Sequence, residues 1–142
     1  MPNSLLILWP VGALAALTFV MLTGILISRI GAVRKRQVSP RDFALGESKR
    51  VPARLTQISR NYASLLELPV LFYVVCLLMI VTKTVSDVQL VLAWLFVAFR
   101  AAHTIIHVTI NHILLRLFAF ASSVTVLVVM WVLFFVRVSA IG

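Results

Sequence analysis

The sequence predicts an all-α integral membrane protein, a bundle of four helices that crosses the bilayer four times. Three observations lead to this prediction. Hydrophobic residues make up 62% of the 142-residue chain and charged residues only 12%, and a soluble domain of this size cannot bury so much apolar surface. The apolar residues fall into four long runs, and most basic residues lie between the first run and the second. Residues 1–142 are therefore expected to form a single transmembrane domain.

The first helix is predicted over about residues 5–30, with a basic cluster after it and no basic residue before it. This charge order is the reverse of a cleavable signal peptide, so the helix is expected to remain as an anchor. Nine of the thirteen Lys and Arg lie between Arg29 and Arg60, in and around a predicted loop over residues 31–53 with room for one helical turn. Because basic loops face the cytoplasm, both termini are expected outside.

The other three helices are predicted over about residues 54–82, 88–110 and 114–138. The second is polar in its first three turns and apolar afterwards, and a tight turn at Asn111-His112 joins the third to the fourth. Each run has about 23 residues or more, enough to cross a hydrocarbon core of about 30 Å. The runs must be helices, because lipid offers no partner to an unpaired backbone amide.

Polar side chains at membrane depth are the candidate functional residues. On the third helix the spacing of 3.6 residues per turn places them on one stripe: Arg100, His103, His107 and Asn111. The second helix carries a similar stripe with two neighbours beside it: Gln57, Arg60, Ser64 and Glu67, flanked by Arg54 and Asn61. Arg116 opens the fourth helix. The two stripes and Arg116 are expected to converge on one cavity.

Arg100 is predicted to lie about 15 Å into the membrane and Glu67 about 20 Å. An arginine at this depth needs a partner, so the two side chains are predicted to approach each other. A structural ion pair is one interpretation of this pair, and interhelical hydrogen bonding is one interpretation of His103 and His107. A ligand pocket accounts better for the number of cations, because a bundle held by packing does not need them.

Other classes of function fit less well. Two histidines at i and i+4 can share a metal ion, but Arg100 and Arg116 repel a cation, so no metal is expected. A proton path lacks ionisable groups in the outer halves of the helices. Nucleic-acid binding is not expected, because the basic residues cluster in one loop. Cys76, the single cysteine, lies in an apolar run and is interpreted as a packing residue.

Two motifs resemble those of the MAPEG family, the membrane-associated proteins in eicosanoid and glutathione metabolism. The third-helix run Arg100-Ala-Ala-His103-Thr-Ile-Ile-His107 is similar to the family's Arg-x-x-His motif, which a tyrosine follows. The second-helix run from Arg54 through Arg60-Asn61 to the segment Glu-Leu-Pro-Val-Leu-Phe-Tyr at residues 67–73 is similar to its other signature, in a bacterial form. The resemblance extends over essentially the whole chain.

The resemblance implies a homotrimer in the bacterial inner membrane that binds glutathione, as co-substrate, between neighbouring subunits. The activity implied is a glutathione-dependent transferase or peroxidase that acts on lipophilic electrophiles or lipid hydroperoxides. A non-catalytic assembly or accessory subunit with the same fold is the alternative. The resemblance assigns thiolate stabilisation to Arg116 and glutathione binding to eight residues: Arg34, Arg54, Arg60, Asn61, Glu67, Arg100, His103 and His107. Membrane lipid and a lipophilic small molecule are the other expected partners.

The sequence departs from the family pattern at three positions. Ser64 stands where the family has an acidic residue three positions after the asparagine, and Glu67 is the nearest replacement. Ala53 stands where an acidic residue often precedes the first arginine, and His107 stands in place of tyrosine. These changes concern the part of the site that would hold the amino group of glutathione.

Overall fold

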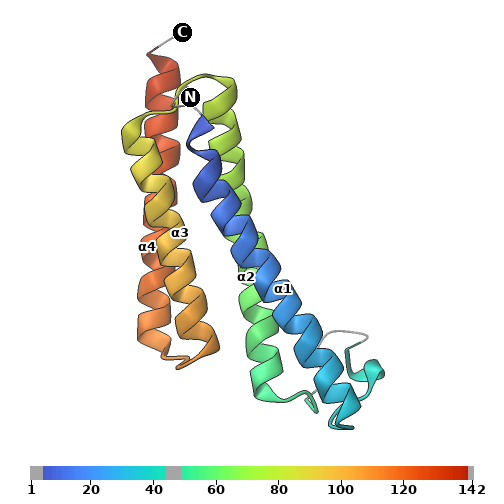
Figure 1. The fold of residues 1–142 in the computed structure, drawn as a ribbon. Coiled ribbons are helices and arrows are strands. Elements are labelled where there is room, and N and C mark those ends of the chain that lie inside the picture. The colour runs from blue at the N-terminus through green and yellow to red at the C-terminus, as the bar shows by residue number, and fades with distance from the viewer. Residues whose placement is uncertain (1–4, 44–48, 141–142) are drawn as a thin grey trace.

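The computed structural model describes residues 5–43 and 49–140 and confirms the all-α fold (Figure 1). Its long helices are α1 (Leu8–Arg34), α2 (Ala53–Val81), α3 (Asp87–Val108) and α4 (Ile113–Ser139). Each of them is long and apolar enough to cross a membrane. The described ranges contain no β-strand. The start of α1 and the end of α4 lie at the same end of the bundle (Figure 1), as an even number of crossings requires.

The largest difference from the predicted bounds is at the end of α1, which continues to Arg34 rather than stopping near residue 30. The loss of apolar residues does not end a helix, because Lys and Arg have good helix propensity and extend their charged ends into water. The helix ends where Arg36 adopts a left-handed φ of 56° and the Gln37 N–H donates to the Ala32 carbonyl at 3.0 Å.

The loop after α1 contains the single helical turn that its composition suggested, a 3-10 turn over Pro40–Phe43. The remainder of the predicted loop includes residues 44–48, which lie outside the described residues. The helices α2, α3 and α4 begin and end within two residues of their predicted bounds. Ser86 caps the start of α3 by accepting a hydrogen bond from the Gln89 N–H at 3.4 Å.

The half of the bundle near the termini is tightly packed, and we call it the packed half. Phe72 of α2 stacks on Phe96 of α3 with ring centroids 4.6 Å apart, and both rings are fully buried. Cys76 lies in the same apolar core, as the sequence predicted. The Gln89 side chain donates to the Met130 carbonyl of α4 at 3.0 Å, so its buried amide is partly satisfied.

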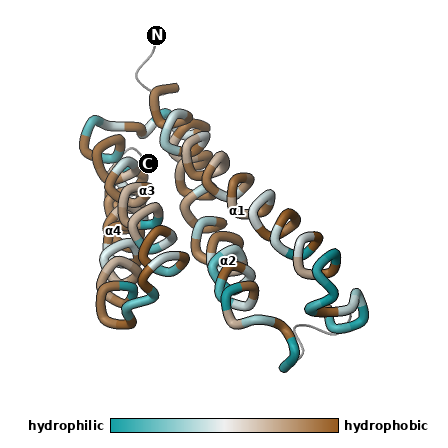
Figure 2. The backbone as a smooth tube through the Cα atoms, turned by 60° about the horizontal axis from the view of Figure 1, so that its bottom comes forward, coloured by the Kyte–Doolittle hydropathy of each residue, from teal (hydrophilic) through white to brown (hydrophobic). Residues whose placement is uncertain are grey.

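The other half is open. The α1–α2 pair diverges from the α3–α4 pair toward the end where the α1–α2 loop lies, which we call the basic end (Figure 1). Hydrophilic residues gather there (Figure 2). Between the two halves, α2 contains the fully buried Pro69, which lacks the N–H that would bond to the Leu65 carbonyl. The divergence leaves room for a cavity between α2, α3 and α4.

Candidate functional site

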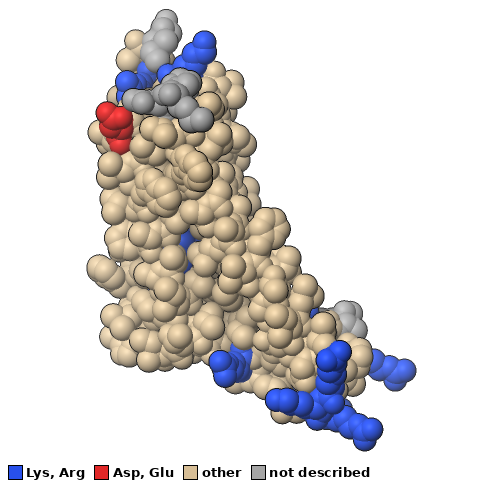
Figure 3. Space-filling model, in the orientation of Figure 1, with Lys and Arg blue, Asp and Glu red and all other residues tan. Residues whose placement is uncertain are grey.

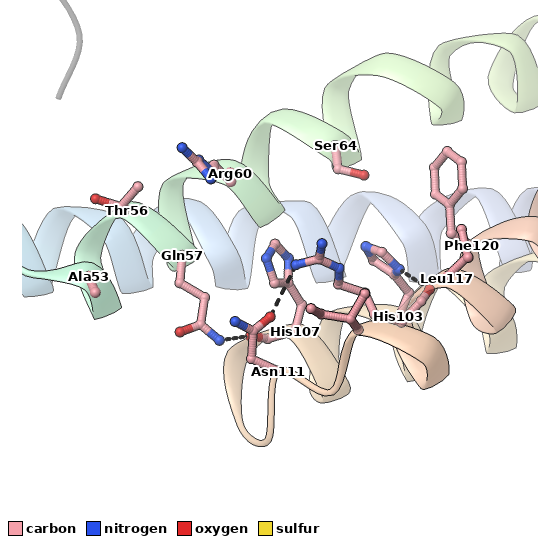
Figure 4. A pocket seen from close by; sticks show the side chains of 12 residues that line it. Ala53, Thr56, Gln57, Arg60, Ser64, His103, His107, Asn111, Leu117 and Phe120 are labelled. Atoms are coloured by element: carbon pink, nitrogen blue, oxygen red, sulfur yellow. Dashed lines mark hydrogen bonds between the residues drawn. The ribbon is translucent and has the colours of Figure 1, made fainter.

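A cavity of about 720 Å³ lies between α2, α3 and α4 near the basic end, and we call it the polar pocket. Its α2 and α3 walls are largely polar, and its α4 wall is largely apolar (Figure 4). The α2 wall consists of Ala53, Thr56, Gln57, Arg60 and Ser64. The remaining wall consists of His103, His107, Asn111, Ile113, Arg116, Leu117 and Phe120. The pocket thus combines cationic and apolar surfaces.

His103 is held with one ring nitrogen fixed and the other available. Its Nδ1 lies 3.1 Å from the backbone carbonyl oxygen of Arg116. A carbonyl can only accept, so Nδ1 carries the hydrogen of the neutral ring and Nε2 has a free lone pair. Figure 4 shows this second nitrogen directed into the pocket. The neutral ring can therefore take a proton from a ligand in the pocket.

His107 links α3 to α2 beside the polar pocket. Its Nδ1 lies 3.4 Å from Oδ1 of the fully buried Asn61, and its ring centroid lies 5.7 Å from that of His103. The Gln57 side-chain amide donates to the His107 backbone carbonyl, one of the carbonyls near the end of α3 that has no partner within the helix. These contacts hold the last turn of α3 against α2.

Arg116 is half-buried at the start of α4. Its Nη1 donates to the Asn111 side-chain oxygen at 3.1 Å, so the turn between α3 and α4 orients the guanidinium. Asn111 itself has a left-handed φ of 47°, a conformation that asparagine tolerates better than most residues. The guanidinium has five N–H donors, which leaves several for an anionic ligand.

Arg100 is fully buried behind the wall of the pocket. Its Nη2 donates to the Ser64 carbonyl at 2.6 Å and to the Ser64 hydroxyl at 3.0 Å. Its Cζ lies 6.0 Å from the centroid of the Phe120 ring. Its Nε and Nη1 have no hydrogen-bond partner among the described residues.

Arg100 and Glu67 lie close enough to interact electrostatically, but the hydrogen bonds of Arg100 do not go to Glu67. Arg100 bonds to Ser64, one turn of α2 nearer the basic end, while Glu67 is exposed on the surface of the bundle. The physical reason is the length of the arginine side chain, which reaches along the helix axis to a residue at a different depth from its own Cα.

The predicted site residues fall into three groups. Four of them line the polar pocket: Arg60, His103, His107 and Arg116. Asn61 and Arg100 are fully buried and contact residues of its wall. The structure does not bring the other three to the pocket of the same chain: Arg34 lines a separate cavity with Phe43, Arg54 lines another with Lys35, and Glu67 is exposed.

Several lining residues were not predicted as site residues. Gln57, Ser64 and Asn111 belong to the polar stripes recognised in the sequence, so helical spacing identified their face but not their contact with the pocket. Thr56 and Phe120 were missed. Phe120 follows Arg116 by one turn of α4, and this spacing is the signal that places both on one face.

Basic residues dominate the charge at this end of the molecule (Figure 3). Within the described residues, no group of three or more His, Cys, Asp or Glu is placed to hold a metal ion. The chemistry available to the pocket is therefore the binding of anions by guanidinium groups, proton transfer at His103, and apolar contact along α4.

A comparison with models of known families gives one match, to the model described as the MAPEG family, over residues 7–136. This match covers α1, α2 and α3, α4 as far as residue 136, and all of the pocket. No curated protein and no solved structure matches the chain.

Proposed function

The chain belongs to the MAPEG family, and on that premise we propose that it is a glutathione-dependent transferase or peroxidase acting on lipophilic electrophiles or lipid hydroperoxides. The observation that carries this proposal is the polar pocket, in which the Arg116 guanidinium and an apolar wall line the same cavity. Such a cavity suits a reaction between a charged thiol and a partner dissolved in the membrane.

The cationic walls suit glutathione. Its two carboxylates match guanidinium groups through paired hydrogen bonds, and Arg60 and Arg116 line the pocket. The thiol reacts as the thiolate, and a nearby fixed cation favours that form. In the proposed mechanism Arg116 stabilises the thiolate and Nε2 of His103 accepts the thiol proton. The hydrogen bond from His103 to the Arg116 carbonyl sets the positions of both groups together.

The α4 wall suits the second substrate. Ile113, Leu117 and Phe120 line the pocket and are 69%, 59% and 36% exposed. Apolar side chains exposed on a membrane-spanning helix contact lipid in a single copy of the chain. A lipophilic electrophile or hydroperoxide can therefore enter the pocket sideways from the bilayer, while glutathione enters from the water at the basic end.

A non-catalytic accessory subunit is the alternative to an enzyme. In such a protein the space between α2, α3 and α4 would be filled by side chains, with Arg100 neutralised by an acidic partner. Two observations support the enzyme over this alternative: the cavity of about 720 Å³, and the Nε and Nη1 of Arg100, which have no hydrogen-bond partner within the described part of the chain.

We also propose that the protein assembles as a homotrimer in the bacterial inner membrane, with the basic end in the cytoplasm. Basic residues concentrate at that end, as the positive-inside rule describes. Glu67 is exposed on a membrane-spanning segment, where lipid contact is costly for a carboxylate, and a second copy would cover it. In the trimer, Arg34 and Arg54 of one copy would reach the polar pocket of its neighbour.

The test is glutathione binding to the purified protein in nanodiscs, measured by calorimetry together with the ultraviolet difference spectrum of the thiolate. We expect binding with a thiolate signal, and loss of that signal in Arg116→Ala. Arg137→Ala is the matched control, because Arg137 is exposed at the opposite end of α4. No binding at millimolar glutathione by the folded protein would exclude the proposal.

A further inference from the structure

The turn between α3 and α4 is held from both sides. The Asn111 N–H donates to the Ile106 carbonyl near the end of α3 at 2.7 Å, and the Leu115 N–H of α4 donates to Nδ1 of His112 at 3.4 Å. Asn111 has a left-handed φ of 47°, and its side chain lines the polar pocket (Figure 4). This side chain therefore extends into the pocket from a backbone held in one conformation.

The contact with Arg116 determines how the Asn111 amide is oriented. Nη1 of Arg116 lies 3.1 Å from Oδ1 of Asn111. A guanidinium can only donate, so the atom beside it is the amide oxygen and not the amide nitrogen. The nitrogen Nδ2, with its two N–H donors, is the part of the amide that remains for a ligand. Asn111 is exposed, so a molecule in the pocket can reach it.

The amide and the guanidinium can share one anion. Oδ1 of Asn111 accepts one of the two hydrogens on Nη1 of Arg116, and the second hydrogen remains for a ligand. Nδ2 is bonded to the same carbon as Oδ1, so an anion at this second hydrogen is within reach of Nδ2 as well. The turn fixes both donors before a ligand arrives, and donors fixed in advance are those that stabilise a charge most.

We propose that Asn111 is a catalytic residue whose Nδ2 donates a hydrogen bond to the sulfur of the thiolate bound beside Arg116. The inference rests on the proposed function, since it adds a donor to the same site. Asn111 exchanges no proton in this role. It stabilises the negative charge that remains on sulfur after the thiol proton has left. The simpler interpretation of Asn111 is that it only forms the turn, a role that glycine would perform equally well.

Asn111→Gly separates these two roles, because glycine adopts a left-handed φ without strain and lacks the amide. The measurement is the pKa of the bound thiol, obtained by pH titration of the ultraviolet thiolate absorbance of the full chain in nanodiscs saturated with glutathione. Asn111→Gly is expected to raise this pKa by about one pH unit, which leaves about tenfold less thiolate near neutral pH. Lys83→Gly is the matched control, since Lys83 has a left-handed φ of 56° in the turn at the opposite end of the bundle. It is expected to leave the thiol pKa unchanged.

The same substitution in the Arg116→Ala protein tests whether Asn111 acts by itself. A residue that only holds Arg116 in place has no effect once the guanidinium is gone, whereas a direct donor still raises the pKa of the thiol. The titration can be carried to high pH, where the thiolate forms even without Arg116. We expect Asn111→Gly to raise the thiol pKa in both backgrounds.

Four outcomes would contradict the inference. An unchanged thiol pKa in Asn111→Gly would leave Asn111 as a turn residue, and weaker glutathione binding with an unchanged thiol pKa would place its amide at a carboxylate of the ligand. A rise confined to the protein that retains Arg116 would make Asn111 a positioning residue only. These three results leave the proposed function standing. Absence of glutathione binding by the wild-type protein would overturn the proposed function and the inference with it.

Discussion

The two halves of the bundle consist of the same helices but differ in how closely these helices pack. In the packed half, Phe72, Phe96 and Cys76 fill the space between the helices and are fully buried. In the half near the basic end, the same helices diverge around the polar pocket. Among the described residues, Nδ2 of Asn61 and Nε and Nη1 of Arg100 have no hydrogen-bond partner there. The comparison shows that the packed half supplies the stability that the open half requires, because unpaired buried polar groups destabilise a fold.

The largest expected effect is a loss of stability when a phenylalanine of the packed half is replaced by alanine. The same replacement in the open half is expected to cost much less. Phe96→Ala removes a fully buried ring stacked on Phe72 and is expected to lower the free energy of unfolding by about 3–5 kcal/mol. Phe120→Ala removes a ring that is 36% exposed at the pocket and is expected to cost about 1 kcal/mol or less, because little packing is lost.

Thermal denaturation of the two variants in the same detergent measures this difference in stability. Equal losses of stability would mean that the open half is packed as tightly as the other. Phe120→Ala should in addition weaken the binding of a lipophilic substrate, which Phe96→Ala should not do in the protein that remains folded.

The next effect concerns chemistry rather than packing. Arg116→Ala is expected to lower kcat by about 10²–10³-fold, the usual consequence of removing one donor that stabilises a developing anion. Arg137→Ala is expected to leave kcat unchanged, since Arg137 is exposed at the end of α4 in the packed half. Steady-state conjugation of a model electrophile measures both. A similar loss in the two variants would show that general positive charge, rather than position, matters.

A smaller effect is expected at His103. His103→Asn places an amide N–H near the position of Nδ1, so the bond to the Arg116 carbonyl can be kept while the acceptor Nε2 is lost. The expected result is a fall in kcat of about tenfold with little change in KM. This fall is smaller than the usual contribution of a general base, because water in the open pocket can take the proton instead.

Proton release on glutathione binding separates catalysis from structure at this residue. The wild-type protein is expected to pass the thiol proton through His103 to the solvent, whereas His103→Asn is expected to slow this release about tenfold. Unchanged proton release together with lower stability would assign His103 a structural role only.

The same comparison shows how much the sequence could predict. In the packed half, hydropathy alone predicted the helices and the buried position of Cys76, because both depend on where the chain is apolar. In the open half the sequence predicted which face of each helix is polar, and four of the predicted site residues line the pocket: Arg60, His103, His107 and Arg116. It did not predict that Arg100 bonds to Ser64 rather than to Glu67, because helical spacing fixes the direction of a side chain but not its reach.

The smallest effect is expected at the residues that the structure leaves outside the pocket of their own chain. Arg54 is exposed in a cavity beside Lys35. If a neighbouring subunit completes the site, Arg54→Ala should raise the KM for glutathione about threefold, typical of an exposed charge pair, with kcat unchanged. Steady-state kinetics on the assembled protein, with its mass measured in parallel, is the test. An unchanged KM in a verified trimer would mean that α2, α3 and α4 of one chain form the whole site, whereas a lower kcat would place Arg54 near the reacting thiol.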